Sequence, residues 1–297
     1  MLKQCNNITK YMKGLFVGLN TIDIKFYTNG DPALNKKNRI DRTRIDIGGP
    51  ATNAAIAFAK LGGKSILITA IGKHDFKEYI FKELYNSRIE IIDIADEKRI
   101  SPSFSGIITN LKNGERTVLS DYSVYDDIKS GHEFPEDFDV CLMDGFLMKT
   151  AQNIAEKAKH LGKPVVLDGG SWKTGMEMVL KYIDCIICSA DFYAPGCTTH
   201  DENIGYLHNR GIRNVAITRG GDSIIASQNR IKTEIPVKKV DVLDTMGAGD
   251  VFHGAYCLFA VKKNNFIQAL ELASVIASES CKYYGTKEWH INSDYGI

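Results

Sequence analysis

Short apolar runs alternate along the chain with segments whose apolar residues recur at helical spacing. Turn residues bound each apolar run. The runs cover residues 14–19, 65–71, 140–143, 164–167, 182–188 and 214–218. Apolar runs separated by helices are typical of parallel strands that are buried on both faces. The pattern therefore predicts an α/β fold, in which helices sandwich a mostly parallel sheet.

Two pairs of segments break this rhythm because they alternate apolar and polar positions. The four segments are residues 22–27, 43–47, 104–109 and 116–119. A turn at residues 110–114 joins the second pair, as expected for antiparallel strands. We expect one small antiparallel β lid, inserted at about 22–47 and 104–120, that covers a site. The sequence shows no linker or internal repeat, so residues 1–297 are expected to form a single domain.

The last third of the chain is predicted to be helical over residues 248–261 and 266–283. In the second segment, Leu270, Ala273, Ile276 and Ala277 recur at the spacing of one helix face.

Composition narrows the class of protein. The 297 residues are 44% hydrophobic and 25% charged, with a net charge of +1 and no long basic block, so no nucleic-acid partner is expected. The apolar runs are shorter than the roughly 18 residues of a membrane span, and the first residues lack the apolar core of a signal peptide. We therefore expect a cytoplasmic protein with no membrane partner. Its seven cysteines, odd in number and irregularly spaced, are expected to be reduced thiols.

The segment with the clearest chemistry is Gly247-Ala248-Gly249-Asp250, where an irregular connection enters a predicted helix after an apolar run that ends near Leu243. Small residues at a helix start let an anion approach unpaired N–H groups and the positive end of the helix dipole. A carboxylate at this position would repel phosphate, unless it faces the attacking hydroxyl and accepts its proton. The turn therefore indicates a kinase, although a simple helix cap would use the same residue types.

Two other glycine-rich binding motifs are excluded, because in each a phenylalanine stands where the motif requires a glycine. A dinucleotide fingerprint beginning at Gly247 needs a third glycine where Phe252 stands. Gly63-Lys64-Ser65 imitates the end of a P-loop, but Phe58 occupies the position of the earlier glycine.

With these residues in view, the chain resembles the ribokinase-like carbohydrate kinases, also called the phosphofructokinase B family. The resemblance rests on DTMGAGD at residues 244–250 and GGPATNAAIAFAKLGG at residues 48–63, and it extends over nearly the whole chain. It implies an ATP-dependent phosphotransferase that acts on a primary hydroxyl of a sugar or sugar-like small molecule. It also implies Mg²⁺ with the ATP, and a homodimer formed through the lid.

The resemblance assigns roles to individual residues. Asp250 matches the catalytic base, and the anion hole corresponds to Gly247, Ala248 and Gly249. The positions that contact the sugar correspond to Asn20, Asp23, Gly48, Gly49, Asn53 and Asp144. The positions that bind ATP correspond to Thr218, Gly220, Gly221 and Lys173. Turn formation and helix capping would also account for Asp23 and Asn53, and simple solvent exposure for Lys173.

The chain departs from the family at two places. Ser223 replaces a glycine of the nucleotide loop, and Phe192 stands where many members carry a glutamate that organises magnesium through water. We therefore assign no metal ligand. Asp244 and Thr245 match positions that bind a monovalent cation in some relatives, so K⁺ is a candidate activator. His253 lies one helical turn after Asp250, where it can line the pocket or simply pack.

A zinc site is imitated by Cys185 and Cys188 together with Cys197 and His200. Cys185 and Cys188 lie three residues apart in a predicted strand, so they should point to opposite faces and should not bind one ion.

Two alternative functions remain open on the sequence. One is a nucleoside kinase of the same fold, in which Phe26, Tyr27 or Phe104 of the lid stacks on the base. The other is a catalytically idle sugar sensor, suggested by the altered segment 189–192 and opposed by the intact DTMGAGD.

Overall fold

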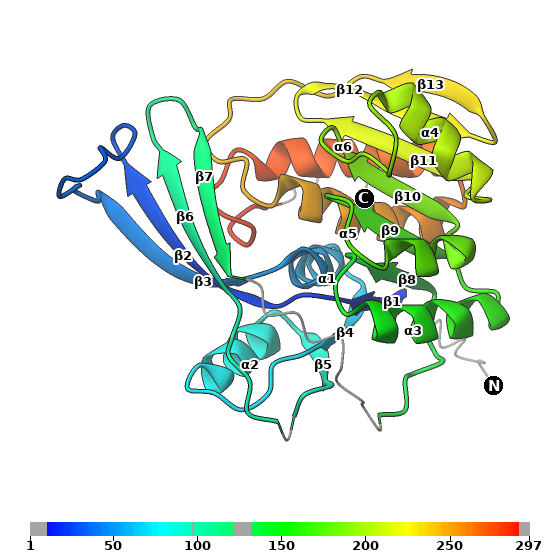
Figure 1. Cartoon of the computed structure of the whole chain (residues 1–297), viewed down its shortest axis with the longest axis horizontal. Helices are drawn as coiled ribbons and strands as arrows, with labels where there is room; N and C mark the ends of the chain where they lie inside the picture. Colours follow the sequence, from blue (N-terminus) through cyan, green and yellow to red (C-terminus); the bar gives the residue numbers. More distant parts are fainter. Residues whose placement is uncertain (1–10, 97, 122–131, 291–297) are drawn as a thin grey trace, which may run out of the picture.

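The computed structural model describes residues 11–96, 98–121 and 132–290. Its core is a nine-stranded sheet with the order β13-β12-β11-β10-β9-β8-β1-β4-β5 (Figure 1). The pairings from β11 to β5 are all parallel, and β12 and β13 add an antiparallel edge. The parallel strands are β1 (Lys13–Val17), β4 (Lys64–Thr69), β5 (Ile89–Asp93), β8 (Val140–Met143), β9 (Val165–Gly169), β10 (Cys185–Ser189) and β11 (Asn214–Arg219). The antiparallel strands are β12 (Asp222–Gln228) and β13 (Ile231–Ile235), and β13 is the edge.

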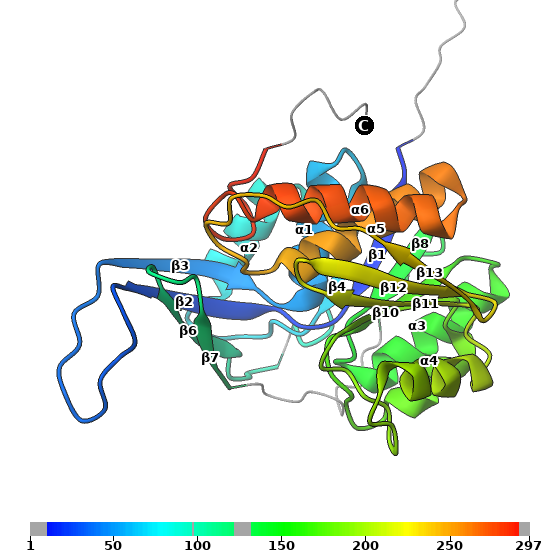
Figure 2. The same ribbon diagram turned by 90° about the horizontal axis from the view of Figure 1, so that it is seen from above.

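Helices cover both faces of this sheet, as expected (Figure 2). One face packs against α1 (Pro50–Lys60), α2 (Lys77–Asn86), α5 (Ala248–Lys263) and α6 (Phe266–Ser280). The other packs against α3 (Met148–His160), α4 (His200–Asn209) and the short 3₁₀ turns η1 (Met176–Met178) and η2 (Leu180–Tyr182). Alternate residues of each strand supply the two apolar layers, which is why the strands read as continuous apolar runs.

A smaller, four-stranded sheet stands off one end of the core, at the left in Figure 1. Its order is β3-β2-β6-β7, with bounds β2 (Thr21–Thr28), β3 (Arg42–Gly48), β6 (Phe104–Asn110) and β7 (Arg116–Asp121). The two hairpins are antiparallel, as predicted, and they meet through a parallel pairing of β2 with β6. We call this sheet the lid. One face, which carries Asp23, looks toward the carboxyl ends of the parallel strands.

The expected elements recur with small differences. The predicted strand at residues 182–188 begins only at Cys185, because Tyr182 closes a 3₁₀ turn, and the apolar run before Leu243 is irregular rather than a strand. Cys185 packs in one apolar layer and Cys188 in the other, so they do point to opposite faces. In the part of the chain that the structure describes, the helices are too short or too polar for a membrane span.

Candidate active site

A cavity of about 390 Å³ lies between the lid and the carboxyl ends of the parallel strands. The lid contributes Thr21, Asp23, Ser105, Ile107, Arg116 and Val118 to its walls. The core contributes the ends of β9, β10 and β11 and the beginnings of α1 and α5. This is the edge of an α/β sheet at which ligands bind, and β1 lies where the order of the strands reverses.

The residues of the predicted anion hole lie at the beginning of α5. Gly247 precedes the helix with a φ of 65°, a left-handed conformation that suits glycine. The helical hydrogen-bond ladder begins when Val251 N–H donates to Gly247 O at 2.9 Å. The N–H groups of Gly249 and Asp250 precede that bond, so they face the cavity end of the helix with the positive pole of its dipole.

Asp250 lies in this first helical turn and lines the cavity. The amide nitrogen of Asn53 donates a hydrogen bond to its Oδ2 atom at 2.7 Å. Burial and the neighbouring negative charge of Asp168 raise the pKa of Asp250 to about 7, against the opposing effects of Asn53 and of His253. A carboxylate with a pKa near the working pH is well suited to accept a proton from a hydroxyl.

His253 lies one turn further along α5 and is both packed and cavity-lining, so it combines the two roles considered above. Its Nδ1 atom lies 2.7 Å from Gly249 O and its Nε2 atom 3.1 Å from Ile187 O. Both partners are carbonyl oxygens, which only accept, so a ring nitrogen donates to either of them when it carries a proton. The carboxylate of Asp168, at the end of β9, lies 3.5 Å from Nδ1. Asp168 and His253 thus lie together beside Asp250.

The predicted sugar contacts Asp23, Gly49 and Asn53 line the same cavity. Burial raises the pKa of Asp23, whose Oδ1 atom accepts a hydrogen bond from the Thr21 hydroxyl at 2.7 Å. Gly48 is required here because a Cβ atom would lie 2.1 Å from Asp23 Oδ2. Carboxylate and amide groups arranged in this way can bind vicinal hydroxyls.

Asn20 and Asp144 do not line this cavity, so the structure gives no support to the predicted sugar contact of either residue. The Asp144 carboxylate is buried and accepts hydrogen bonds from the backbone N–H groups of Leu19, Ala51 and Phe146. It therefore ties β1, α1 and the end of β8 together. Asn20 likewise donates to the Thr52 hydroxyl at 3.3 Å, so both residues support the walls of the site.

A second cavity, of about 460 Å³, adjoins the first. Thr218, Gly220, Gly221 and Ala248 line it, and Gly249 and Thr218 line both cavities. The second cavity thus brings together three of the predicted ATP positions and two residues of the predicted anion hole. Its apolar part is formed by Ile224, Val237, Val242, Phe252 and Ala277. A polar end beside the anion hole and an apolar end suit a nucleotide that points its phosphates at Gly249.

Lys173 lines neither cavity, so the structure gives no support to its predicted contact with ATP. Its ammonium group donates to Asp144 O at 3.1 Å and lies over the ring of Phe146. The side chain is therefore held against the loop after β8.

Arg116 is a cavity residue that the sequence did not reveal. It lies on β7 of the lid, lines both cavities, and donates to the Thr245 hydroxyl at 2.5 Å. The strand register places it on the same lid face as Asp23, through the pairs Arg116 with Thr109 and Thr109 with Tyr27. The alternating pattern of β7 indicated a face, but only the register shows that this face looks into the site.

The residues present do not fit a dedicated magnesium cage. Phe192 is fully buried and packs against Trp172, and Asp191 alone of the altered segment offers a carboxylate to the second cavity. Within the described residues, no three histidine, cysteine, aspartate or glutamate side chains cluster as metal ligands would.

The lid aromatics proposed to stack on a nucleoside base lie elsewhere. Phe26 and Phe104 alternate with Asp23 and Ser105, which places them on the opposite face of the lid. Tyr27 is buried against Tyr284, with its hydroxyl 3.5 Å from Asp244 Oδ2. The described walls of the first cavity contain no phenylalanine, tyrosine or tryptophan.

Comparison with known proteins relates the chain to carbohydrate kinases. Residues 13–291 match the sequence profile of the pfkB family carbohydrate kinases. The deoxyribokinase of Salmonella typhi is 23% identical over 91% of this chain and 93% of its own length. The fructosamine kinase of Bacillus subtilis is 25% identical over 80% of this chain and 84% of its own length.

Solved structures share the fold. A protein of Agrobacterium tumefaciens, described provisionally as a ribokinase, superposes with a TM-score of 0.84 at 26% identity, over 94% of each chain. Arabidopsis thaliana ribokinase in complex with ribose and ATP superposes with a TM-score of 0.72 at 17% identity, over 93% of this chain and 94% of that one. At that identity the second likeness concerns the fold alone.

Proposed function

Because the chain belongs to the pfkB family of carbohydrate kinases, we propose that it transfers the γ-phosphoryl group of ATP to a primary hydroxyl of a sugar or sugar-like small molecule. The observation that carries this proposal is the meeting of two cavities at Gly249, with Asp250 on the acceptor side. The reacting hydroxyl would lie against Asp250, and the phosphates of ATP would lie in the cavity lined by Thr218, Gly220 and Gly221.

In the proposed reaction, Asp250 accepts the proton of the acceptor hydroxyl as its oxygen attacks the γ-phosphorus. The bond between the γ-phosphorus and the bridging oxygen of ADP breaks in the same displacement. The N–H groups at the start of α5 stabilise the charge on the transferring oxygens, as does Arg116 from the lid. Asp23 and Asn53 hold other hydroxyls of the acceptor. Lid closure would exclude water and so limit the hydrolysis of ATP.

Mg²⁺ would enter this site with the phosphates of ATP and water rather than in a protein cage. K⁺ activation through Asp244 and Thr245 stays a proposal. The Asp244 carboxylate accepts hydrogen bonds from the backbone N–H groups of Met246 and Gly285, each at 2.9 Å.

A homodimer through the lid is proposed from the outer lid face. A row of residues crosses that face, Ile45, Ile24, Gly106 and Leu119, and 51% of Ile45 and 63% of Leu119 is exposed. An apolar row on a sheet with two open edges favours a second copy as its partner. Sedimentation as a monomer at working concentration would remove this proposal.

The sugar is favoured over the nucleoside as acceptor because no described phenylalanine, tyrosine or tryptophan side chain offers the first cavity a stacking surface. The test is ADP release on a panel of acceptors that includes 2-deoxyribose, ribose, fructosamine, fructose 6-phosphate and common nucleosides. Thermal shift on the same panel detects binding without turnover. Turnover with a sugar supports the proposal, turnover with nucleosides alone supports the rival kinase, and binding without ADP release supports an idle sensor.

A further inference from the structure

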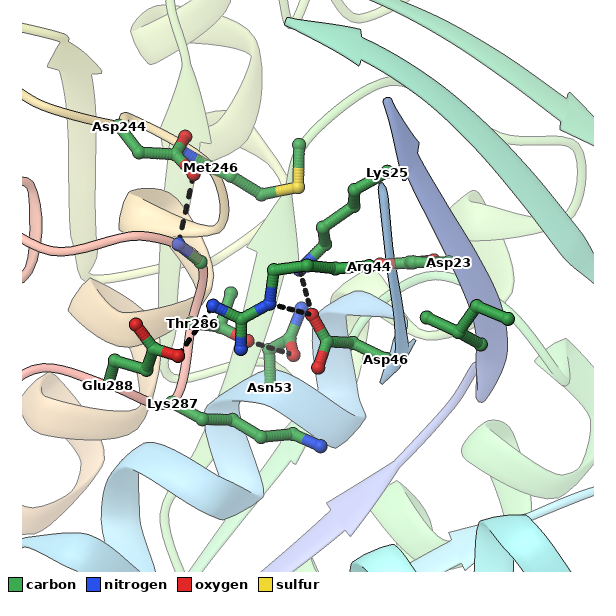
Figure 3. A network of polar contacts seen from close by, with 12 residues as sticks. Asp23, Lys25, Arg44, Asp46, Asn53, Asp244, Met246, Thr286, Lys287 and Glu288 are labelled. Carbon is green, nitrogen blue, oxygen red and sulfur yellow. Dashed lines mark hydrogen bonds and ion pairs between the residues drawn. The ribbon is translucent and has the colours of Figure 1, made fainter. Parts of the chain in front are cut away.

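Thr286 lies in the loop after α6, at the point where the lid, α1 and the start of α5 come together (Figure 3). It is buried, it lines neither cavity, and its hydroxyl donates to Asn53 Oδ1 at 3.1 Å. Asn53 in turn uses its amide nitrogen on Asp250. A hydroxyl outside the site is thus joined to the proposed base through a single amide.

The backbone around Thr286 is held on both sides. Gly285 N–H donates to Asp244 Oδ2 at 2.9 Å, and the indole nitrogen of Trp289 donates to Thr286 O at 2.8 Å. The Thr286 methyl group packs so closely on Gly247 that a Cβ atom at Gly247 would lie 2.1 Å from it. These contacts fix the hydroxyl relative to the start of α5.

The same loop is anchored to the lid. Glu288 accepts a hydrogen bond from Arg44 of β3 at 2.5 Å, and the buried Lys25 forms an ion pair with Asp46 at 2.9 Å beside Gly285 (Figure 3). The loop therefore holds Thr286 between the lid and Asn53.

The direction of the hydrogen bonds matters for Asn53, because its amide can be turned over so that its oxygen and nitrogen exchange places. With the Thr286 O–H group donating to Oδ1, the amide nitrogen faces Asp250. In the turned-over amide the oxygen would face the carboxylate, an arrangement that requires Asp250 to be protonated. The Thr286 oxygen would then accept from the amide nitrogen, and its buried proton would lose the acceptor described for it.

We propose that Thr286 is a positioning residue, which holds the Asn53 amide with its N–H group toward Asp250 and so keeps the base ionised. The role rests on the proposed function of Asp250 and deepens it. Other titratable or charged groups also face Asp250: Asp168 from β9, His253 from α5, Asp23 from β2, and Arg116 across the cavity from β7. The Thr286 hydroxyl reaches Asp250 by way of Asn53, whereas the Thr286 methyl group packs on Gly247 at the start of α5.

The test compares Thr286→Val, which removes the hydroxyl but keeps the shape, with Thr286→Ser, which keeps the hydroxyl but removes the methyl group. The ¹³Cγ resonance of Asp250 is titrated with pH in the unliganded protein and identified by its loss in Asp250→Asn. We expect Thr286→Val to raise the titration midpoint by about 0.5 to 1 pH unit, since a hydrogen bond to the ionised form is weakened. Thr286→Ser should stay within about 0.2 of the unmodified protein.

Activity is then measured with the best acceptor of the panel. The acid limb of the kcat/KM profile should move to higher pH in Thr286→Val and not in Thr286→Ser. Thermal unfolding measures the effect of each substitution on packing. An unchanged midpoint in Thr286→Val, or an equal change in both variants, overturns the positioning role. If Thr286→Val does not fold, Thr286→Ala replaces it under the same criteria. The titration needs no substrate, so a wild-type protein without turnover would overturn the proposed function and leave this test intact.

Discussion

The amide nitrogen of Asn53 donates a hydrogen bond to Asp250 Oδ2 across 2.7 Å, and so joins the first turn of α1 to the first turn of α5. These two helix starts are far apart in the sequence, and each carries one of the two glycine-rich segments of the chain. Because the two helix starts meet, the Asn53 amide, which can bind the acceptor molecule, is in direct contact with the Asp250 carboxylate, which can deprotonate the acceptor hydroxyl. Binding and proton transfer are therefore expected to be coupled.

The charge of Asp168 should set the pH range of the reaction. With the pKa of Asp250 raised to about 7, kcat/KM should rise with pH through about 7 as the base ionises and then level off. Asp168→Asn removes a negative charge that raises this pKa, so the acid limb should move to lower pH by about 0.5 to 1 unit. The profile of Asp201→Asn, at an exposed residue of α4 that lines neither cavity, serves as the control. An acid limb that moves to higher pH, or does not move, would contradict the electrostatic role of Asp168.

Alanine substitutions at Gly247 and Gly249, the two glycines of the proposed anion hole, should affect different properties: the first stability and the second turnover. Gly247→Ala places a Cβ atom against Thr286 at a φ of 65°, so it should lower the free energy of unfolding by about 1 to 3 kcal/mol. Gly249→Ala meets no atom within 4 Å and lies in the helix, so stability should be kept or slightly increased. Its methyl group would stand where phosphate must approach, and turnover should fall by about tenfold or more. Chemical denaturation and ADP release separate the two effects. Full activity in Gly249→Ala would exclude close approach of the phosphate at this turn.

Arg116 should act on the transferring group because it lines both cavities. Arg116→Gln is expected to lower kcat by about tenfold to a hundredfold, since it removes a charge that stabilises the phosphoryl oxygens. Arg230→Gln, in the turn between β12 and β13, is the matched control and should leave kcat unchanged. Equal effects of the two substitutions would show that Arg116 acts only through the surface charge.

The sequence predicted the core of the fold because its signals are local. Six apolar runs correspond to β1, β4, β8, β9, β10 and β11, and the alternating segments correspond to the four lid strands. Strands β5, β12 and β13 were not predicted, because partly exposed strands lack a continuous apolar run. The parallel pairing of β2 with β6 was not predicted either, since pairing between distant strands leaves no mark in either segment.

The candidate site was likewise predictable only where its residues are adjacent in the sequence. Gly247, Gly249 and Asp250 were predictable because the chemistry of a helix start is contained in adjacent residues. Asp144 followed a strand end as a ligand-binding residue should, but three backbone N–H groups use its carboxylate. Arg116 and Thr286 could not be found from local patterns, since the lid register places the first and the loop after α6 places the second.

The most direct test of the account is the turnover of Asp250→Asn with the best sugar acceptor, measured beside its affinity for that sugar and its thermal stability. The substitution keeps the size of the side chain but cannot accept the hydroxyl proton. We predict that kcat falls by about a hundredfold to ten-thousandfold while folding and sugar binding are retained. Turnover equal to that of the unmodified protein would contradict the assignment of Asp250 as the base.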